Sequence, residues 1–132
     1  MTFKGYIVQV LCFVPLFLLI VKENMMKREN KFQAELIKEL KQLFPGIVIL
    51  KNDANYIQGI PDLLLLFKDK WAMLEVKKTG NASHRPNQDY YVSRLNEMSF
   101  ARFIFPENKE EVLHELEQTF NSRRATRISK RK

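Results

Sequence analysis

Asp62, Glu75 and Lys77 are charged residues that stand at the ends of strongly apolar segments. Pro61 precedes Asp62, and because proline cannot donate a ladder hydrogen bond, it fits the first position of a strand. Asp62 is therefore expected at the entrance of that strand. Glu75 and Lys77 are two residues apart, so their side chains should project from the same face of the next strand. Two acids beside a lysine have the chemistry to hold a hard cation and to act on a phosphate ester.

The pairing register of the expected hairpin decides whether the two acids meet. If the turn falls on Lys68 and Asp69, Asp62 lies directly opposite Glu75, with Cβ atoms about 4.5–5.5 Å apart. Carboxylates this close repel each other unless a cation neutralises them, and Mg²⁺ characteristically takes one or two carboxylates in addition to water and phosphate oxygens. A register shifted by one residue would send the acids to opposite faces. The sequence thus predicts a Mg²⁺ or Mn²⁺ site that depends on one register.

Lys77 would complete this chemistry. An ammonium beside the metal can orient the attacking water, or help to deprotonate it, and stabilise the negative charge that develops during phosphodiester hydrolysis. Proton transfer by lysine requires a lowered pKa, which a neighbouring cation would supply. Acidic residues also flank many hairpins by chance, but the strongly apolar strands next to this trio favour the functional interpretation.

The elements around the trio follow from the hydrophobic pattern. A helical period runs from Lys27 to Phe44 and ends at Pro45-Gly46. Apolar runs predict a hairpin and two further strands, and helical patterns predict two more helices. The expected strands are 47–50, 63–67, 71–76 and 101–105, and the later helices are 87–98 and 109–120. The order α-β-β-β-α-β-α predicts an α/β domain.

With these elements in place, Ile60-Pro61-Asp62 and Glu75-Val76-Lys77 together resemble the signature of the PD-(D/E)XK nuclease superfamily, over about residues 27–106. The likeness is to its VRR-NUC and phage-type branch, which is itself similar to archaeal Holliday-junction resolvases. The resemblance implies a restriction-endonuclease-like α-β-β-β-α-β core in three layers with a mixed sheet. It also implies metal binding by Asp62, Glu75 and the Val76 carbonyl, catalysis by Lys77, and DNA cleavage with Mg²⁺ or Mn²⁺.

The family usually adds an acid from the first helix and, in this branch, a glutamine after the lysine. Glu35 and Glu39 are the obvious acids, but helical phase points Glu35 away from the apolar stripe. The same phase places Glu29 within the stripe, so Glu29 is the prediction, with a solvated helix start as the alternative. Gln88 would be the glutamine. It would contact the DNA backbone or hold Lys77 in place, or it would simply occupy the first turn of a helix.

The net charge of +7 over 132 residues belongs to the C-terminal tail. Residues 121–132 carry a net charge of +6 and residues 1–25 carry +1, whereas residues 26–120 sum to zero. The tail is either a solvated, disordered terminus or an arm that binds phosphate with strong salt dependence. The expected nucleic-acid contacts are Lys78 and Arg85 near the trio, and Arg123, Arg124 and Arg127 in the tail.

Residues 1–25 are largely apolar and allow three interpretations. Tyr6 to Val21 spans 16 residues, fewer than the roughly 20 that a membrane helix needs, and no clear cleavage site for a signal peptide follows. Met25-Met26 stands just before an amphipathic domain start, so the segment is an upstream extension, a signal or an anchor. The expected organisation is this extension at 1–25, the nuclease domain at 26–120 and a basic flexible tail at 121–132.

The composition fits one compact domain, since domains usually run about 100–150 residues. The single cysteine, Cys12, excludes an internal disulfide and a cysteine-based zinc site, and it suits the cytoplasm. Such a small domain has little surface for reading base sequence. We therefore expect a structure-specific DNA endonuclease, with branched DNA as a candidate substrate and a homodimer as a reasonable assembly. An inactive nucleic-acid-binding module on the same fold and a membrane-anchored, non-enzymatic protein remain as alternatives.

Overall fold

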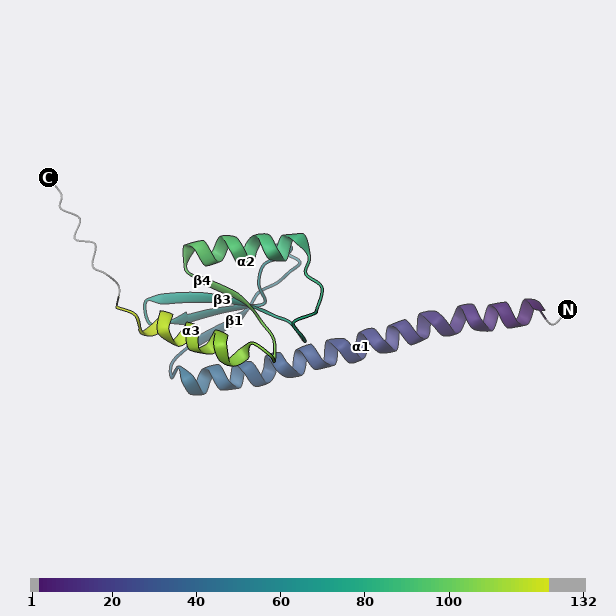
Figure 1. Cartoon of the computed structure of the whole chain (residues 1–132), viewed down its shortest axis with the longest axis horizontal. Helices are drawn as coiled ribbons and strands as arrows, with labels where there is room; N and C mark the ends of the chain where they lie inside the picture. The colour runs from purple at the N-terminus through teal and green to yellow at the C-terminus, as the bar shows by residue number, and fades with distance from the viewer. Residues whose placement is uncertain (1–2, 124–132) are drawn as a thin grey trace.

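The computed structural model describes the backbone of residues 3–123 and the side chains of residues 15–123. In chain order its elements are α1 (Phe3–Leu43), β1 (Val48–Lys51), β2 (Leu63–Phe67), β3 (Lys70–Val76), α2 (Pro86–Met98), β4 (Phe100–Ile104) and α3 (Lys109–Asn121). This is the order expected from the hydrophobic pattern, and the protein is of the α/β class (Figure 1).

The four strands form one sheet in the order β1-β2-β3-β4. Strand β2 is antiparallel to both β1 and β3, and β4 runs parallel to β3. Parallel neighbours need a crossover connection, which α2 supplies. The sheet is therefore mixed. Helix α2 lies over one face, and α3 and the C-terminal part of α1 lie over the other (Figure 1).

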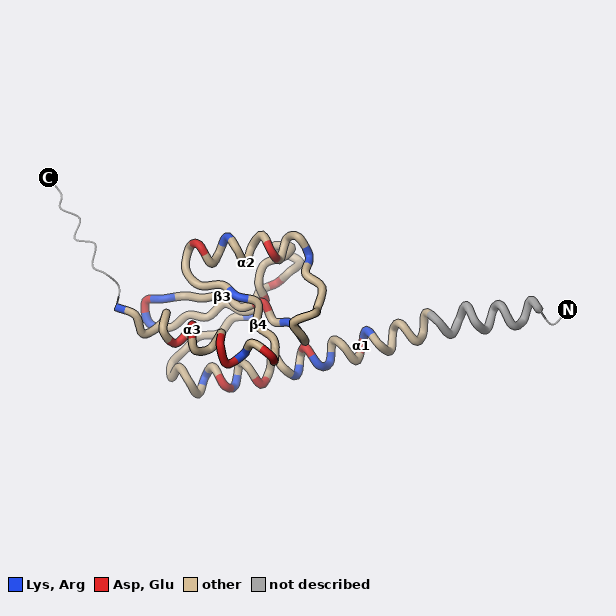
Figure 2. The backbone as a smooth tube through the Cα atoms, in the orientation of Figure 1, with Lys and Arg blue, Asp and Glu red and all other residues tan. Residues whose placement is uncertain are grey.

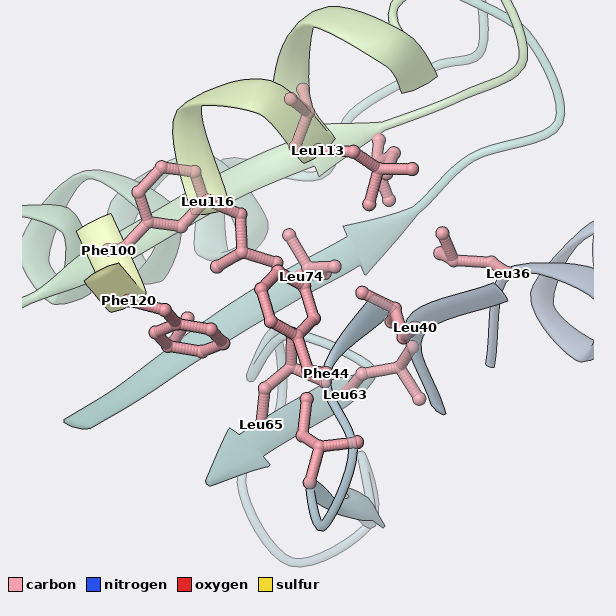
Figure 3. Close-up of a cluster of buried hydrophobic side chains, with 14 of the residues drawn as sticks. Leu36, Leu40, Phe44, Leu63, Leu65, Leu74, Phe100, Leu113, Leu116 and Phe120 are labelled. Atoms are coloured by element: carbon pink, nitrogen blue, oxygen red, sulfur yellow. The ribbon is translucent and has the colours of Figure 1, made fainter. Parts of the chain in front are cut away.

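Alternate residues of the central hairpin build the main core. On β2 these are Leu63, Leu65 and Phe67, and on β3 they are Ala72, Leu74 and Val76. They pack against α1 and α3 (Figure 3), which contribute Leu36, Leu40, Phe44, Val112, Leu113, Leu116 and Phe120. Because strand side chains alternate between faces, the residues between them point to the α2 side. Glu75 is one of these residues. Because Leu74 and Val76 on either side of it face the core, the Glu75 side chain points toward α2.

The C-terminal end of α3 is fixed at the turn end of the hairpin. The Lys70 Nζ donates to the carbonyl oxygens of Thr119 at 3.0 Å and Phe120 at 3.3 Å. A cation at this position satisfies carbonyls that have no partner within the helix and complements the helix dipole. The chain beyond α3 therefore starts from the end of the sheet that carries the turn.

Helix α1 begins much earlier than the sequence pattern predicted. We expected a helix from Lys27, whereas it begins at Phe3 and passes Met25-Met26 without a break. Pro15 lies inside the helix. Side chains from Pro15 to Arg28 are all exposed, and Glu29 is the first that is partly buried. Burial, rather than helix formation, thus marks where α1 joins the domain.

The exposed part of α1 includes a continuous apolar run. Leu16 to Ile20 are each about half exposed or more, and Met26 is 56% exposed. Among the described residues, no helix is both long and apolar enough to cross a membrane.

A chain of residues 25–132 is expected to unfold at the same temperature as the full chain. The removed side chains that the structure describes are exposed, so deleting them takes no buried contact from the core. Circular dichroism melts of both chains measure this, and size-exclusion chromatography reports association through the exposed apolar run. A clearly lower midpoint for the shortened chain would show that the extension supports the fold.

Candidate active site

The hairpin has the register that the metal site requires. Its pairs run from Phe67 opposite Lys70 to Leu63 opposite Leu74, so the next position sets Asp62 against Glu75. The Asp62 backbone N–H donates to Glu75 Oε2 at 3.1 Å, which joins the two residues directly. The predicted register is confirmed, and both acids lie on the face of the sheet that α2 covers.

Asp62 is held at the entrance of β2 by hydrogen bonds from both sides. Its carbonyl accepts from the Asn52 N–H at 2.9 Å, and the Asn52 side-chain amide donates to the Pro61 carbonyl at 2.8 Å. The Val76 N–H donates to Asp62 Oδ2 at 2.9 Å. No described residue donates a hydrogen bond to Oδ1. Because no buried side-chain oxygen of the described residues is left without a partner, Oδ1 keeps some exposure to solvent.

The main-chain carbonyl of Val76 is directed toward the same side of β3 as Asp62. In a strand, the N–H and C=O of one residue point to the same side, and the Val76 N–H points to Asp62. The register places Pro61 opposite Val76, and proline has no N–H to donate. The Val76 carbonyl therefore receives no ladder hydrogen bond from Pro61. Its place in the predicted ligand set agrees with this geometry.

Lys77 is buried beside Glu75, with which it forms an ion pair, and its Nζ donates hydrogen bonds to two further oxygens. Only 3% of Glu75 and 8% of Lys77 is exposed, and the Lys77 Nζ lies 3.6 Å from Glu75 Oε1. Nζ also donates to Gln88 Oε1 at 2.8 Å and to the Ser83 carbonyl at 3.3 Å. A buried ammonium with fixed acceptors is oriented, as a catalytic lysine requires.

Gln88 links the lysine to the acid. While its Oε1 accepts from Lys77, its Nε2 donates to Glu75 Oε1 at 2.5 Å. Oε1 also accepts from the Arg85 backbone N–H at 3.1 Å, which ties the side chain to the first turn of α2. Of the roles considered for Gln88, the geometry supports holding Lys77 in place.

Burial raises the pKa values of both acids, and repulsion by Asp62 adds to the shift of Glu75. The pKa of Glu75 is raised to about 7, chiefly by burial and then by the charge of Asp62, although Lys77 partly opposes this. Burial also raises the pKa of Asp62, against the hydrogen bond from the Val76 N–H. Such pairs favour a proton or a cation between them.

Glu29 lies within electrostatic reach of the trio. Burial raises its pKa, the charge of Asp62 raises it further, and Lys77 lowers it. Glu35 is exposed, and Glu39 pairs with Lys109 at 2.8 Å, so neither of these joins the site. Helical phase thus pointed to an acid that interacts electrostatically with Asp62 and Lys77. Within the described part of the chain, however, no three His, Cys, Asp or Glu side chains form a group suited to hold a metal ion.

The acids open into a pocket of about 410 Å³. Asp62, Glu75 and Gln88 line it, together with Arg85, which directly precedes α2. Lining residues from the loop before Asp62 are Ala54, Asn55, Gln58, Gly59 and Ile60. Gly59 is required here, because its φ of +90° suits glycine and an added Cβ would lie 2.5 Å from the Asn87 Cβ. The close approach of Gly59 and Asn87 brings the loop against α2 and closes this side of the pocket.

The predicted nucleic-acid contacts separate into two groups. Arg85 is exposed at the pocket, and Lys78 acts electrostatically on Glu29. Arg123 instead follows α3 at the turn end of the hairpin, where Lys70 is five residues from Glu75, or about 17 Å along the strand at 3.3 Å per residue. It does not join the site. Arg124 and Arg127 lie outside the described residues.

Several residues that shape the site were not found from the sequence. Asn52 and Ser83 contribute hydrogen bonds, and Asn87 meets Gly59. Gly59 was part of the motif, but its contact with α2 depends on tertiary packing. The polar residues carry no spacing signal, since each acts through its position in a loop or at a helix start.

Comparisons with protein-family models, with curated protein sequences and with solved structures gave no match to this chain.

Without metal, the free energy of unfolding is expected to fall as the pH rises from 4.5 to 7. The folded state favours the protonated Glu75, whose pKa is raised from 4.5 to about 7, so it binds more protons than the unfolded chain in this range. This stability is complete below pH 4.5 and is lost as the pH rises through 7, by up to about 3 kcal/mol. Urea unfolding at pH 5 and 8 measures it.

Mn²⁺ should restore that stability at pH 8 and have little effect at pH 5, where it must displace a proton. The raised pKa values of Asp62 and Glu29 change the stability with pH in the same direction as that of Glu75. The variant Glu75→Gln, which lacks the titration of Glu75, therefore serves as the comparison. An identical decline in Glu75→Gln would assign the pH dependence to other groups.

If the chain has the metal-dependent nuclease activity that the sequence predicts, replacing Gln88 by alanine is expected to lower the cleavage rate about 10–100-fold, as for other groups that orient a metal ligand. The pH–rate profile should also shift to higher pH, because Glu75 loses a hydrogen bond that favours its ionised form. Rates measured from pH 6 to 9 separate this positioning role from a structural one. A slower enzyme with an unshifted profile would contradict it.

Proposed function

We propose that this chain is a metal-dependent DNA endonuclease that hydrolyses phosphodiester bonds with Mg²⁺ or Mn²⁺. The observation that carries the proposal is the opposition of Asp62 and Glu75 across the β2–β3 hairpin, with Lys77 on the same face. We assign the domain to the restriction-endonuclease-like core, whose α-β-β-β-α-β order agrees with α1 to β4.

The donor set suits a hard divalent cation. It offers the solvent-facing Oδ1 of Asp62, a Glu75 carboxylate and the Val76 carbonyl, and Mg²⁺ prefers such oxygen ligands. The raised pKa of Glu75, which comes chiefly from burial and then from the charge of Asp62, adds to this, because a cation would stabilise the ionised acid in place of the proton. Glu29 is close enough to add charge to the site.

The residues then divide the chemistry. A bound divalent ion would activate a water and polarise the phosphate. Lys77 holds a positive charge at the edge of the carboxylates, where it can orient the water and stabilise charge on the phosphate oxygens. Gln88 and the Ser83 carbonyl fix its Nζ, so the ammonium need not reorganise during reaction.

The rest of the proposal concerns substrate and setting. The pocket between the loop 54–60 and α2 holds one exposed arginine, Arg85, and offers little surface for reading several bases. We therefore favour structure-specific cleavage, with branched DNA as the first substrate to test. Two copies acting together would cut both strands, and a cytoplasmic location suits a protein whose single cysteine needs no oxidising compartment.

A substrate panel tests the proposal. Duplex, single-stranded and four-way-junction DNA and a matching RNA are incubated with the protein in Mg²⁺, Mn²⁺ or EDTA. We expect cleavage of at least one DNA that requires the metal. Binding without cleavage under every condition would instead support an inactive nucleic-acid-binding module, and neither binding nor cleavage would remove nucleic acid as the partner.

A further inference from the structure

Two hollows flank α1 next to the site. One, of about 490 Å³, is lined by Arg28 and Lys78 together with Met25 and the loop 79–83. The other, of about 370 Å³, is lined by Arg28, Lys31, Phe32, Glu35, Pro106 and Lys109. Arg28 borders both, so the hollows follow one another along the helix. Figure 2 shows lysine and arginine positions on α1 where it leaves the sheet.

The charged side chains without a salt bridge in these hollows are mostly basic, with Glu35 as the one acid among the lining residues. Lys109 is occupied by salt bridges to Glu39 and Glu110. Arg28, Lys31 and Lys78, by contrast, form no salt bridge with any side chain that the structure describes. Exposed basic groups without partners are what a phosphate backbone recruits.

The larger hollow adjoins the candidate active site through Ser83. The Ser83 carbonyl accepts a hydrogen bond from the Lys77 Nζ, and Ser83 also lines the larger hollow. Lys78 follows Lys77 directly and interacts electrostatically with Glu29, whose pKa is also raised by the charge of Asp62. Basic groups therefore stand on both sides of the acids, with Arg85 in the pocket and Arg28 with Lys78 beyond Lys77.

We propose that Arg28, Lys31 and Lys78 bind the phosphates of the substrate strand on one side of the cleaved bond, while Arg85 contacts the strand on the other side. This inference rests on the proposed nuclease function and specifies its substrate as an extended strand, bound across the site and cut internally. Arg123, the last residue that the structure describes, lies at the other end of the sheet and does not supply these contacts near α1.

We call Arg28, Lys31 and Lys78 the basic track. The test removes two charges from this track and, in a separate variant, two charges from elsewhere on α1. The track variant is Arg28→Ala/Lys31→Ala. The control is Lys38→Ala/Lys41→Ala, which changes the net charge equally at exposed positions that line neither hollow. Binding of a fluorescent oligonucleotide is followed by anisotropy between 50 and 200 mM salt, with Ca²⁺ in place of Mg²⁺, and thermal melts confirm that both variants fold.

The track variant should bind at least about tenfold more weakly, and its slope of log K against log salt should be smaller by about 1.5, from the loss of two phosphate contacts. The control should keep the wild-type affinity and slope. Equal losses in both variants would assign the effect to net charge and overturn the track, as would wild-type binding by the track variant. Absence of metal-dependent cleavage by the wild type is a separate result, which would refute the nuclease proposal.

Discussion

Replacing Lys77 by methionine is expected to lower the cleavage rate about 10³-fold while the affinity for metal stays within a few-fold of wild type. The rate should fall because the variant loses the cation that orients the water and stabilises developing charge. Metal binding should survive because Asp62 and Glu75 remain, and a cation that repels the metal is gone. Methionine fits the buried site without a charge, since Lys77 is only 8% exposed.

Single-turnover cleavage and calorimetric titration with Mn²⁺ measure the two effects separately. Lys38→Met is the matched control, because it makes the same change at an exposed position of α1. A Lys77 variant that cleaves at the wild-type rate would remove the lysine from the mechanism. A variant that loses metal binding together with cleavage would show that Lys77 supports the acids rather than the reaction.

Asp62→Asn is expected to weaken Mn²⁺ binding by more than about 10²-fold and to abolish cleavage. Loss of a residue that hydrogen-bonds to a metal ligand already lowers metal affinity or activity about 10–100-fold, so loss of the charge of a ligand itself should lower them more. Asparagine keeps the shape of the side chain and an oxygen that can accept from the Val76 N–H. The fold should therefore persist, with a metal-free stability at pH 8 no lower than that of the wild type.

The control for this variant is Asp89→Asn. Asp89 stands in the first turn of α2 and pairs with His84 on the surface, so it shares the neighbourhood but not the ligand set. Calorimetry should give wild-type Mn²⁺ binding for Asp89→Asn. Unchanged metal binding by Asp62→Asn would place the metal elsewhere, and equal weakening in both variants would indicate only a general field effect.

The hairpin shows why the centre of the site was predictable. Strand alternation fixes which residues share a face, and the turn on Lys68 and Asp69 fixes the register. Local patterns therefore specified that Asp62 meets Glu75. Glu29 followed from helical phase in the same way, because Leu36 and Leu40 mark the buried side of α1.

Other features depend on packing between distant segments, which local patterns do not encode. The contact of Gly59 with Asn87 joins a loop to α2, and the Ser83 carbonyl reaches Lys77 through the shape of its loop. The charge distribution along the chain pointed to the tail, whereas the basic groups nearest the acids come from α1 and the loop after β3. Arg28 and Lys31 lie in a segment with no net charge, so only the fold reveals them as a group.

The central claim is that Asp62, Glu75 and the Val76 carbonyl hold one divalent ion. Backbone amide NMR spectra recorded with sub-stoichiometric Mn²⁺ test it most directly, because a paramagnetic ion broadens the signals nearest to it. We expect the signals of Asp62, Glu75 and Val76 to broaden first, whereas that of Phe120, beside the turn end of the hairpin, should change little. Broadening centred on another part of the chain, or none in excess Mn²⁺, would contradict it.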